Sequence, residues 1–200
     1  MAGSEPRRQP ILEAMIRVTG RKGYQATSVA DVVAEARASR ATFYKYFDDK
    51  HDCFLAAHEL AVERVLATAR GGCDRELPWV ERALSGLAAI VDLFAREPEL
   101  ARTTIVEVVA ARDDARRRHS EAIGKLAGLL AEGSEAPRQL QLPPNTALMA
   151  VSGVVGLIFD EVRAGRAEAM HHLLPELEFA LLVPFIGPKA AVREMGRTAV

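Results

Sequence analysis

The sequence predicts an all-α protein with about nine helices. Apolar residues recur at helical spacing along nearly all of its 200 residues, whereas alternating runs of Val, Ile, Thr and aromatic residues bounded by turn signals are missing. Gly and Pro residues interrupt the helical pattern at intervals that suit helix ends. We therefore expect three short helices first and longer ones after them.

Gly and Pro residues mark the expected ends of the helices. The breaks fall at Gly20, Gly23, Gly71, Gly72, Pro78, Pro98, the stretch 133–144, Gly165 and Gly187. Helices whose two ends are both defined cover residues 9–22, 28–36, 39–47, 49–71, 145–163 and 176–186, the last with Pro184 near its end. The change in helix length near residue 50 predicts a module of residues 1–52 and a larger helical domain of residues 53–200. Arg7 and Arg8 place a basic arm or a disordered tail at residues 1–8.

The charge balance allows nucleic-acid binding only through a local patch. The formal net charge is -1, but residues 1–52 carry nine Lys and Arg against seven Asp and Glu. A net charge near zero gives no global attraction to DNA or to acidic membranes. The small positive excess has the sign expected of an N-terminal region that faces DNA.

Several classes of site and location are disfavoured. Cys53 and Cys73 form no CxxC pattern and lie near no histidine cluster, so we expect neither a disulfide framework nor a zinc site. The histidines lack metal-site spacing, and we expect all of them to lie on the surface: His51, His58, His119, His171 and His172. No signal peptide and no run of about 18 apolar residues is found, which predicts a cytoplasmic protein without membrane contact. No cofactor fingerprint appears.

Residues 27–47 predict a helix-turn-helix motif. Thr27 or Ser28 can cap a short helix, Ser28 and Asp31 form a pair typical of a capping box, and valines follow at helical spacing. After a brief interruption, Ser39 can cap a second short helix. Two short helices joined by about three residues are the pattern of this motif.

The second helix combines a core face with a contact face. Phe43 and Phe47 lie on its inward side, whereas Arg40, Ala41 and Lys45 point outward beside Thr42, Tyr44 and Tyr46. Arg can bind guanine edges in a major groove, and Thr or Tyr can contact a thymine methyl group. Lys50 and the hydroxyls of Thr27 and Ser28 suit phosphates. The predicted DNA contacts are therefore Thr27, Ser28, Arg40, Ala41, Thr42, Tyr44, Lys45, Tyr46 and Lys50.

This segment resembles the N-terminal domain of the TetR family of bacterial transcriptional regulators. The resemblance covers about 45 residues and is carried by Ile11, Leu12, Ala14, Gly23, Tyr24, Thr27, Ser28, Val29, Thr42, Phe43, Tyr44, Phe47 and Lys50. The rest of the chain is only loosely similar. Three residues depart from the family pattern: Val33 replaces a small residue, Arg37 replaces a Gly at a turn that favours positive φ, and Tyr46 replaces a frequent His.

The resemblance implies a ligand-binding and dimerisation domain in residues 53–200. A pocket for a small, largely apolar inducer is then expected among Trp79, Leu87, Val91, Phe94, Ile105, Val109, Leu126, Met149 and Phe159, of which most are core residues on sequence grounds alone. The helix at 145–163 has a narrow side of small residues, and the helix at 176–186 is apolar on more than one side. By resemblance these two helices form the homodimer interface, for which we name Ala150, Gly153, Gly156, Leu157, Phe179 and Leu182.

Two functions remain open at the level of sequence. The first is a non-enzymatic, ligand-responsive transcriptional regulator, which the family resemblance implies is a repressor. It would bind a near-palindromic double-stranded DNA operator as a homodimer. The alternative is an all-α small-molecule-binding protein or enzyme whose N-terminal helices are only structural. No set of nucleophile, base and orienting residue can be assembled from this sequence, which favours the first.

Overall fold

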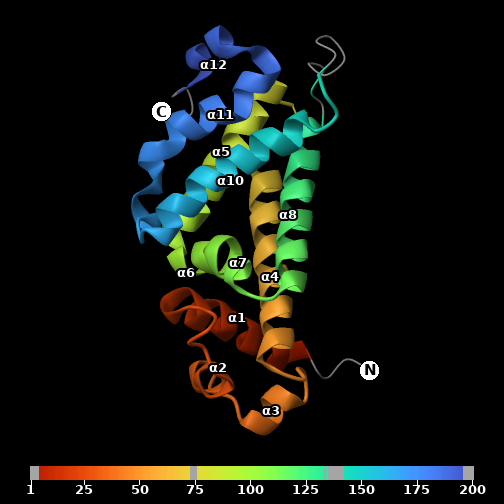
Figure 1. Ribbon diagram of the computed structural model, residues 1–200, viewed down its shortest axis with the longest axis vertical. Coiled ribbons are helices and arrows are strands. Elements are labelled where there is room, and N and C mark those ends of the chain that lie inside the picture. The colour runs from red at the N-terminus through yellow and green to blue at the C-terminus, as the bar shows by residue number, and fades with distance from the viewer. Residues whose placement is uncertain (1–4, 73–75, 133, 135–141, 196–200) are drawn as a thin grey trace. The chain divides into compact units, whose positions relative to one another are not determined.

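The computed structural model describes residues 5–72, 76–132, 134 and 142–195, and the regular elements within them are all helical (Figure 1). In chain order they are α1 (Glu5–Lys22), α2 (Val29–Glu35), α3 (Arg40–Tyr44), α4 (Lys50–Gly71), α5 (Trp79–Arg96), α6 (Pro98–Arg102), η1 (Thr103–Glu107), α7 (Val108–Ala110), α8 (Asp113–Ala131), α10 (Thr146–Arg163), η2 (Ala167–Leu173), α11 (Leu174–Ile186) and α12 (Pro188–Glu194). Of the two η elements, η1 is a π-helix and η2 is a 3-10 helix. The predicted all-α class is confirmed.

The chain forms two compact units. Unit 1 contains residues 1–64 and 97–119, and unit 2 contains residues 65–96 and 120–200. These units do not follow the sequence-based boundary after residue 52, because the first part of α4 and the segment from α6 to the start of α8 belong with the N-terminal helices. A division of function at residue 52 stays a prediction.

Unit 1 is built around α1. This helix packs against α2, α6 and η1, and its apolar side, which includes Ile11 and Met15, is fully buried. The contact with α6 depends on Gly20, because a Cβ atom at this position would lie 2.4 Å from Cα of Glu99. The first helix therefore needs a glycine in its last turn, where the sequence indicated only a helix end.

The start of α1 differs from the prediction. The helix begins at Glu5 instead of about Gln9, with Pro10 inside it, so that Arg7 and Arg8 are helical rather than part of an extended arm. The guanidinium of Arg8 lies 5.4 Å from the centre of the Phe47 ring. This cation–π contact holds Arg8 against the segment that follows α3. Residues 1–4 of the predicted arm lie outside the described residues.

Unit 2 has an apolar core. In it α11 packs against α5, α10 and α12, and Leu84, Leu182 and Ala191 are buried together. The Trp79 ring lies 5.0 Å from the Phe185 ring, and its Nε1 donates a hydrogen bond of 2.7 Å to the Leu130 carbonyl. Trp79 thus closes one end of α5 onto this core.

The C-terminal helices also depart from the prediction. The helix expected at 176–186 begins earlier, at Leu174, and a further helix, α12, follows it. Gly187 turns the chain at φ 75°, and Pro188 occupies the first turn of α12. The sequence pattern indicated Gly187 only as a helix end, and Pro188 was not considered, although Pro is favoured at the first position of a new helix.

One stretch, Ala167–Ile186, is long and apolar enough to cross a membrane by length and composition alone. It is not one regular helix, because η2 gives way to α11 at Leu174. Leu177 and Glu178 are buried in it, as expected for a segment packed within unit 2.

Candidate nucleic-acid interface

Two capped helices form the predicted helix-turn-helix motif within unit 1. Ser28 caps α2 in a full capping box: its backbone N–H donates to the Asp31 carboxylate at 2.8 Å, and the Asp31 N–H donates to the Ser28 hydroxyl at 3.3 Å. Ser39 caps α3 by accepting a hydrogen bond of 3.0 Å from the Thr42 N–H. Both N-caps lie where the sequence placed them. The second helix is shorter than predicted, since it ends at Tyr44 and turns follow through Tyr46.

The turn between α2 and α3 contains a left-handed residue that is not glycine. Arg37 has φ 50°, whereas Ala36 before it is still right-handed. The Ala38 N–H bonds to the Val33 carbonyl at 2.9 Å and the Arg37 N–H bonds to the Ala34 carbonyl at 3.2 Å, which is the Schellman pattern of a helix C-terminus. This pattern places glycine at the position of Arg37. The expected positive φ is confirmed, and the arginine accepts it at a cost of about 1 kcal/mol.

Helix α3 is anchored by its aromatic side. Phe43 and Phe47 are buried, with ring centres 5.4 Å apart. Val32 of α2 is buried as well, and α2 packs against both α1 and α3. The predicted core role of the two phenylalanines is therefore confirmed, and the opposite side of α3 is left at the surface.

The outward side of α3 carries positive charge without acidic neighbours. Arg40, Tyr44 and Lys45 are exposed, and among the described residues neither Arg40 nor Lys45 has a carboxylate within 4.0 Å. The Lys45 ammonium lies 5.9 Å from the centre of the Tyr46 ring. Ala41 is exposed, and Thr42 and Tyr46 are half-buried. A surface of this kind attracts an anionic partner, because no internal ion pair has to be broken first.

Other basic residues of the same module are neutralised instead. Arg17 binds the Glu35 carboxylate at 2.8 Å, Arg21 binds it too, and Lys22 binds Asp31 at 2.7 Å. Hydrogen bonds from Arg17 and Arg21 lower the pKa of Glu35, and those from Lys22 and Ser28 lower the pKa of Asp31 well below its usual range. These pairs join α1 to α2. The charges of Arg17, Arg21 and Lys22 are therefore neutralised, whereas no ion pair is found for Arg40 or Lys45 in the described part of the chain.

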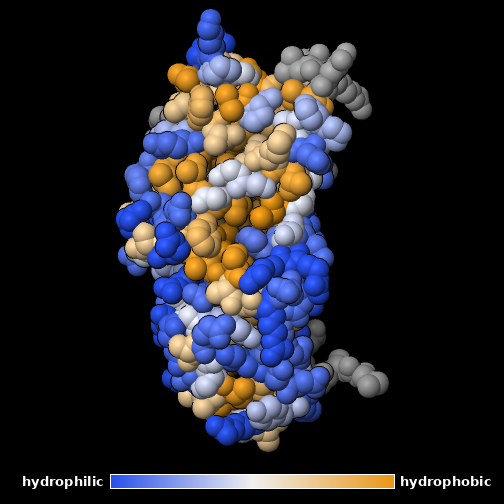
Figure 2. Space-filling view, in the orientation of Figure 1, coloured by the Kyte–Doolittle hydropathy of each residue, from blue (hydrophilic) through white to orange (hydrophobic). Residues whose placement is uncertain are grey.

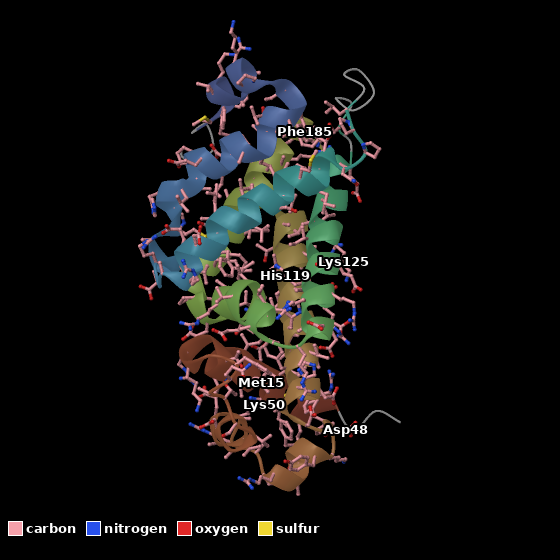
Figure 3. All side chains as sticks on the ribbon, in the orientation of Figure 1. Met15, Asp48, Lys50, His119, Lys125 and Phe185 are labelled. Carbon is pink, nitrogen blue, oxygen red and sulfur yellow. The ribbon has the colours of Figure 1, made fainter. Side chains whose placement is uncertain are left out.

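Two predicted phosphate ligands are already engaged inside unit 1. Thr27 is buried, and its hydroxyl donates a hydrogen bond of 2.8 Å to the Gly23 carbonyl. The Lys50 ammonium, labelled in Figure 3, donates to the Tyr24 carbonyl at 2.9 Å and lies 4.4 Å from the Tyr24 ring centre. Burial and the nearby charge of Arg112 lower the pKa of Lys50. The exposed Ser28 hydroxyl donates to Asp31 at 2.5 Å. Partners of this kind cannot be inferred from a pattern of residue types.

A buried polar network around Tyr24 holds the module in place. The Tyr24 N–H donates to Glu107 of η1 at 2.8 Å, and Glu107 also accepts from Arg102 at 3.0 Å. The Tyr24 hydroxyl lies 3.0 Å from Nδ1 of His51, whose Nε2 lies 2.9 Å from the Asp114 carboxylate of α8. Burial raises the pKa of the Tyr24 hydroxyl, and the hydrogen bond with His51 lowers that of Asp114. The sequence offered no signal for these long-range partners.

The expectation that all histidines lie on the surface is wrong for two of them. His51 and His58 are buried in unit 1, with 7 % and 1 % of their surface exposed. Only His171 and His172 are fully at the surface, and His119 is half-buried. A histidine at an apolar helix position can be buried or exposed, and the sequence pattern alone does not distinguish these two cases. The described residues contain no group of three or more potential metal ligands. Cys53 is a buried free thiol whose pKa burial raises, and Cys73 lies outside the described residues.

The residues predicted to line a ligand pocket are divided between the units. Ile105 and Val109 belong to unit 1 and the other seven to unit 2. Leu87, Val91, Phe94 and Ile105 are buried, Leu126 and Phe159 are half-buried, and Trp79 is committed to the core contact described above. Val109 and Met149 are 39 % and 58 % exposed, and the assignment of these residues to a ligand pocket stays a prediction.

The predicted dimer residues also separate into two groups. Gly153, Gly156 and Leu157 lie on an exposed side of α10, and a Cβ atom at either glycine would meet nothing within 4 Å among the described residues. Figure 2 shows hydrophobic residues gathered on the face of unit 2 that contains α10 and α11. Phe179 is half-buried, whereas Ala150 and Leu182 are buried within unit 2 and face no solvent. Ala150 and Leu182 are therefore not available at the surface of unit 2, and a dimer interface on this face stays a prediction.

Comparison with known proteins agrees with this geometry. Residues 11–57 match the family model of bacterial regulatory proteins of the tetR family. No curated protein sequence gives a significant match. Residues 11–57 therefore carry a helix-turn-helix DNA-binding domain similar to that of the tetR-family regulators.

Solved structures of regulators share the fold over nearly the whole chain. The fatty acid degradation regulator FadR from Bacillus halodurans is 20 % identical, with 87 % of this chain and 96 % of that chain covered and a TM-score of 0.71. A tetR-family regulatory protein from Rhodococcus RHA1 is 18 % identical over 95 % and 97 % of the two chains, with a TM-score of 0.66. The regulator FadR from Bacillus subtilis, in complex with stearoyl-CoA, is 19 % identical over 90 % and 98 %, with a TM-score of 0.69.

Proposed function

We propose that this chain is a transcriptional regulator of the TetR family that inserts α3 into the major groove of an operator. The observation that carries the proposal is the unpaired, exposed charge of Arg40 and Lys45 on a helix whose opposite side is fixed by Phe43 and Phe47. A positive side chain in the first turn of a helix is disfavoured by the helix dipole, so Arg40 does not stabilise α3. Base edges and phosphates are the partners that suit this surface.

Within this surface the residues have different roles. Arg40 and Tyr44 are placed for base edges, and the exposed methyl group of Ala41 permits close approach of the α3 backbone. Lys45 and Tyr46 serve phosphates beside the groove. Lys50 acts first by fixing the Tyr24 loop, and it contacts a phosphate only by sharing its remaining N–H donors. Thr27 supports the cap through Gly23 and has no free hydroxyl hydrogen for DNA.

The working form is a homodimer that joins through α10 and α11. Exposed glycines in a helix interior cost about 1 kcal/mol each, and nothing within the described part of the protomer approaches Gly153 or Gly156 closely enough to explain them. A second copy of α10 explains them, because small residues let two helices pack at short distance. Leu148, Met149 and Leu157, which are 39 %, 58 % and 41 % exposed, supply apolar area on this helix.

Two reading helices related by a twofold axis recognise a near-palindromic operator. A small, largely apolar ligand acts on the body and changes the separation of the two helices, provided that it binds the two states with unequal affinity. The similarity to a FadR that holds stearoyl-CoA supports a ligand with an apolar portion. Repression is the proposed outcome, and the cytoplasm, where a bacterial chromosome lies, is the proposed location.

Fluorescence anisotropy with the duplex upstream of the protein's own gene tests DNA binding. We expect the double variant Arg40→Ala/Lys45→Ala to lose about 100-fold in affinity, because each lost contact costs on the order of 1–3 kcal/mol. The matched control is Arg117→Ala/Lys189→Ala, which removes two exposed positive charges from α8 and α12. Equal losses in both double variants, or binding of the unmodified protein that does not weaken with salt, would contradict the proposal.

A further inference from the structure

Tyr24 is bound on both sides of its backbone by residues from two other elements of unit 1. Its N–H donates to Oε2 of Glu107 in η1 at 2.8 Å, and its carbonyl accepts a hydrogen bond of 2.9 Å from the Lys50 ammonium of α4. The same ammonium lies 4.4 Å from the centre of the Tyr24 ring. Glu107 and Lys50 therefore act on one buried residue, although they are far apart along the chain.

Glu107 is a buried carboxylate that lies outside the segment matched to the DNA-binding domain. It is 6 % exposed, and the matched segment ends at residue 57. Its Oε1 accepts a hydrogen bond of 3.0 Å from Nε of Arg102, which balances its charge. A hydrogen bond to a carboxylate is roughly twice as strong as one between neutral groups. Glu107 therefore holds the Tyr24 N–H firmly.

The loop around Tyr24 passes this constraint on to Lys50. Gly23 has φ 86°, its N–H donates to the Thr19 carbonyl at 2.8 Å, and its carbonyl accepts from the Thr27 hydroxyl at 2.8 Å. With the loop tied on both sides of Tyr24, and with each peptide group planar, the position of the Tyr24 N–H determines that of its carbonyl. The carbonyl takes one N–H of the Lys50 ammonium, and the other N–H donors point elsewhere.

We propose that Glu107 is a positioning residue for DNA binding: by holding the Tyr24 N–H it sets the Tyr24 carbonyl, which aims the Lys50 ammonium at a phosphate. This inference rests on the proposed function, because a phosphate contact of Lys50 requires an operator. It has a sign that simple electrostatics does not share. A carboxylate repels DNA, so its removal would strengthen binding if charge alone mattered. Loss of the positioning contact weakens binding instead.

A double-mutant cycle on the full chain tests this link. The affinity for the duplex upstream of the protein's own gene is measured by fluorescence anisotropy for the unmodified protein, Glu107→Ala, Lys50→Met and the combination. We expect each single variant to lose about tenfold and the combination to lose no more than about tenfold, because without its ammonium Lys50 leaves Glu107 nothing to aim. The dependence of log affinity on log salt should fall by about one unit in all three variants, since each loses the same phosphate contact.

Thr103→Val is the matched control for a merely structural role. Thr103 is also buried in η1, and its hydroxyl donates to the Ile16 carbonyl of α1 at 2.9 Å. The substitution removes a hydrogen bond between η1 and α1 without touching Tyr24. It should lower the free energy of unfolding in urea and leave DNA affinity and its salt dependence unchanged. Glu107→Gln keeps an acceptor for the Tyr24 N–H and should recover part of the affinity that Glu107→Ala loses.

Three results would overturn the inference: losses that multiply to about 100-fold in the combined variant, tighter DNA binding by Glu107→Ala, or a loss of affinity in Thr103→Val equal to that in Glu107→Ala. If Glu107→Ala does not fold, Glu107→Gln replaces it in the cycle, with a loss of about threefold expected beside Lys50 and none in Lys50→Met. An unmodified protein that does not bind the duplex contradicts the proposed function itself. Binding with independent losses contradicts this inference alone.

Discussion

The glycines of α1 and α10 have different surroundings. In α1, Gly20 lies so close to α6 that a Cβ atom would be 2.4 Å from Cα of Glu99. In α10, Gly153 and Gly156 face open space in the protomer. The first glycine is explained by a contact within unit 1. Unit 2 alone gives no contact that explains the other two, and the second subunit that we propose would supply one.

The largest effect is expected when a charge is placed beside Gly153 and Gly156 of α10. Leu157→Arg puts a guanidinium at the centre of the proposed α10 interface. Because the proposed dimer is twofold symmetric, both sides of the interface carry the substitution. We expect the dimer dissociation constant, measured by analytical ultracentrifugation, to rise about 1000-fold, equivalent to roughly 4 kcal/mol. Val192→Arg is the control, because Val192 is also apolar and is 59 % exposed on α12. Equal dissociation constants for both variants would remove α10 from the interface.

The next largest effect is expected at Gly20, which lies against α6. Gly20→Ala forces α1 and α6 apart, because the new methyl group meets backbone atoms that cannot rotate away. Urea unfolding should show a free energy of unfolding lower by about 3 kcal/mol. Gly124→Ala on α8, where nothing lies within 4 Å of the added Cβ atom, should leave stability unchanged or raise it by up to about 1 kcal/mol. A neutral Gly20→Ala would mean that α6 can shift freely.

Substitutions of Gly153 and Gly156 should have a smaller effect, which shows whether these glycines serve a contact with a second subunit or no contact. Gly153→Ala and Gly156→Ala each favour the helix by about 1 kcal/mol but prevent close approach of a partner helix. If the second subunit packs there, the dimer weakens about tenfold for each change despite the gain in helix propensity. Sedimentation measures the dimer, and thermal unfolding measures the helix. A variant that is more stable and equally dimeric would show that the glycines serve no contact.

The smallest effect concerns a position where glycine is absent. Arg37 has φ 50° in the turn between α2 and α3, and Arg37→Gly should raise the free energy of unfolding by about 1 kcal/mol. Arg37→Ala separates conformation from charge, because alanine keeps the strained φ and should give no such gain. If both variants gain equally, the arginine charge and not the backbone is responsible.

Local features of the DNA-binding module could be predicted from the sequence. Ser28 and Ser39 cap α2 and α3, and Phe43 and Phe47 lie in the core, because caps and helical periodicity depend on neighbours within a few residues. The positive φ of Arg37 was expected from the family pattern. The length of α3 was overestimated, since helix boundaries are set by the turn that follows.

Features that depend on distant residues were missed or misjudged. Thr27 and Lys50 were assigned to phosphates, but Gly23 and Tyr24 already bind them. Ala150 and Leu182, which were assigned to a dimer interface, are buried within unit 2. Glu107 gave no signal at all, although it accepts the Tyr24 N–H across 83 positions of the chain.

The sequence by itself determined the helical class, the helix-turn-helix with its caps, and the face of α3 that carries Arg40 and Lys45. These features follow from periodicity and from hydrogen bonds between residues a few positions apart. Only the tertiary structure decided which basic residues are neutralised, which glycines have a neighbour, and which histidines are buried. The physical reason is that ion pairs, close backbone contacts and desolvation depend on distances between segments that are far apart along the chain.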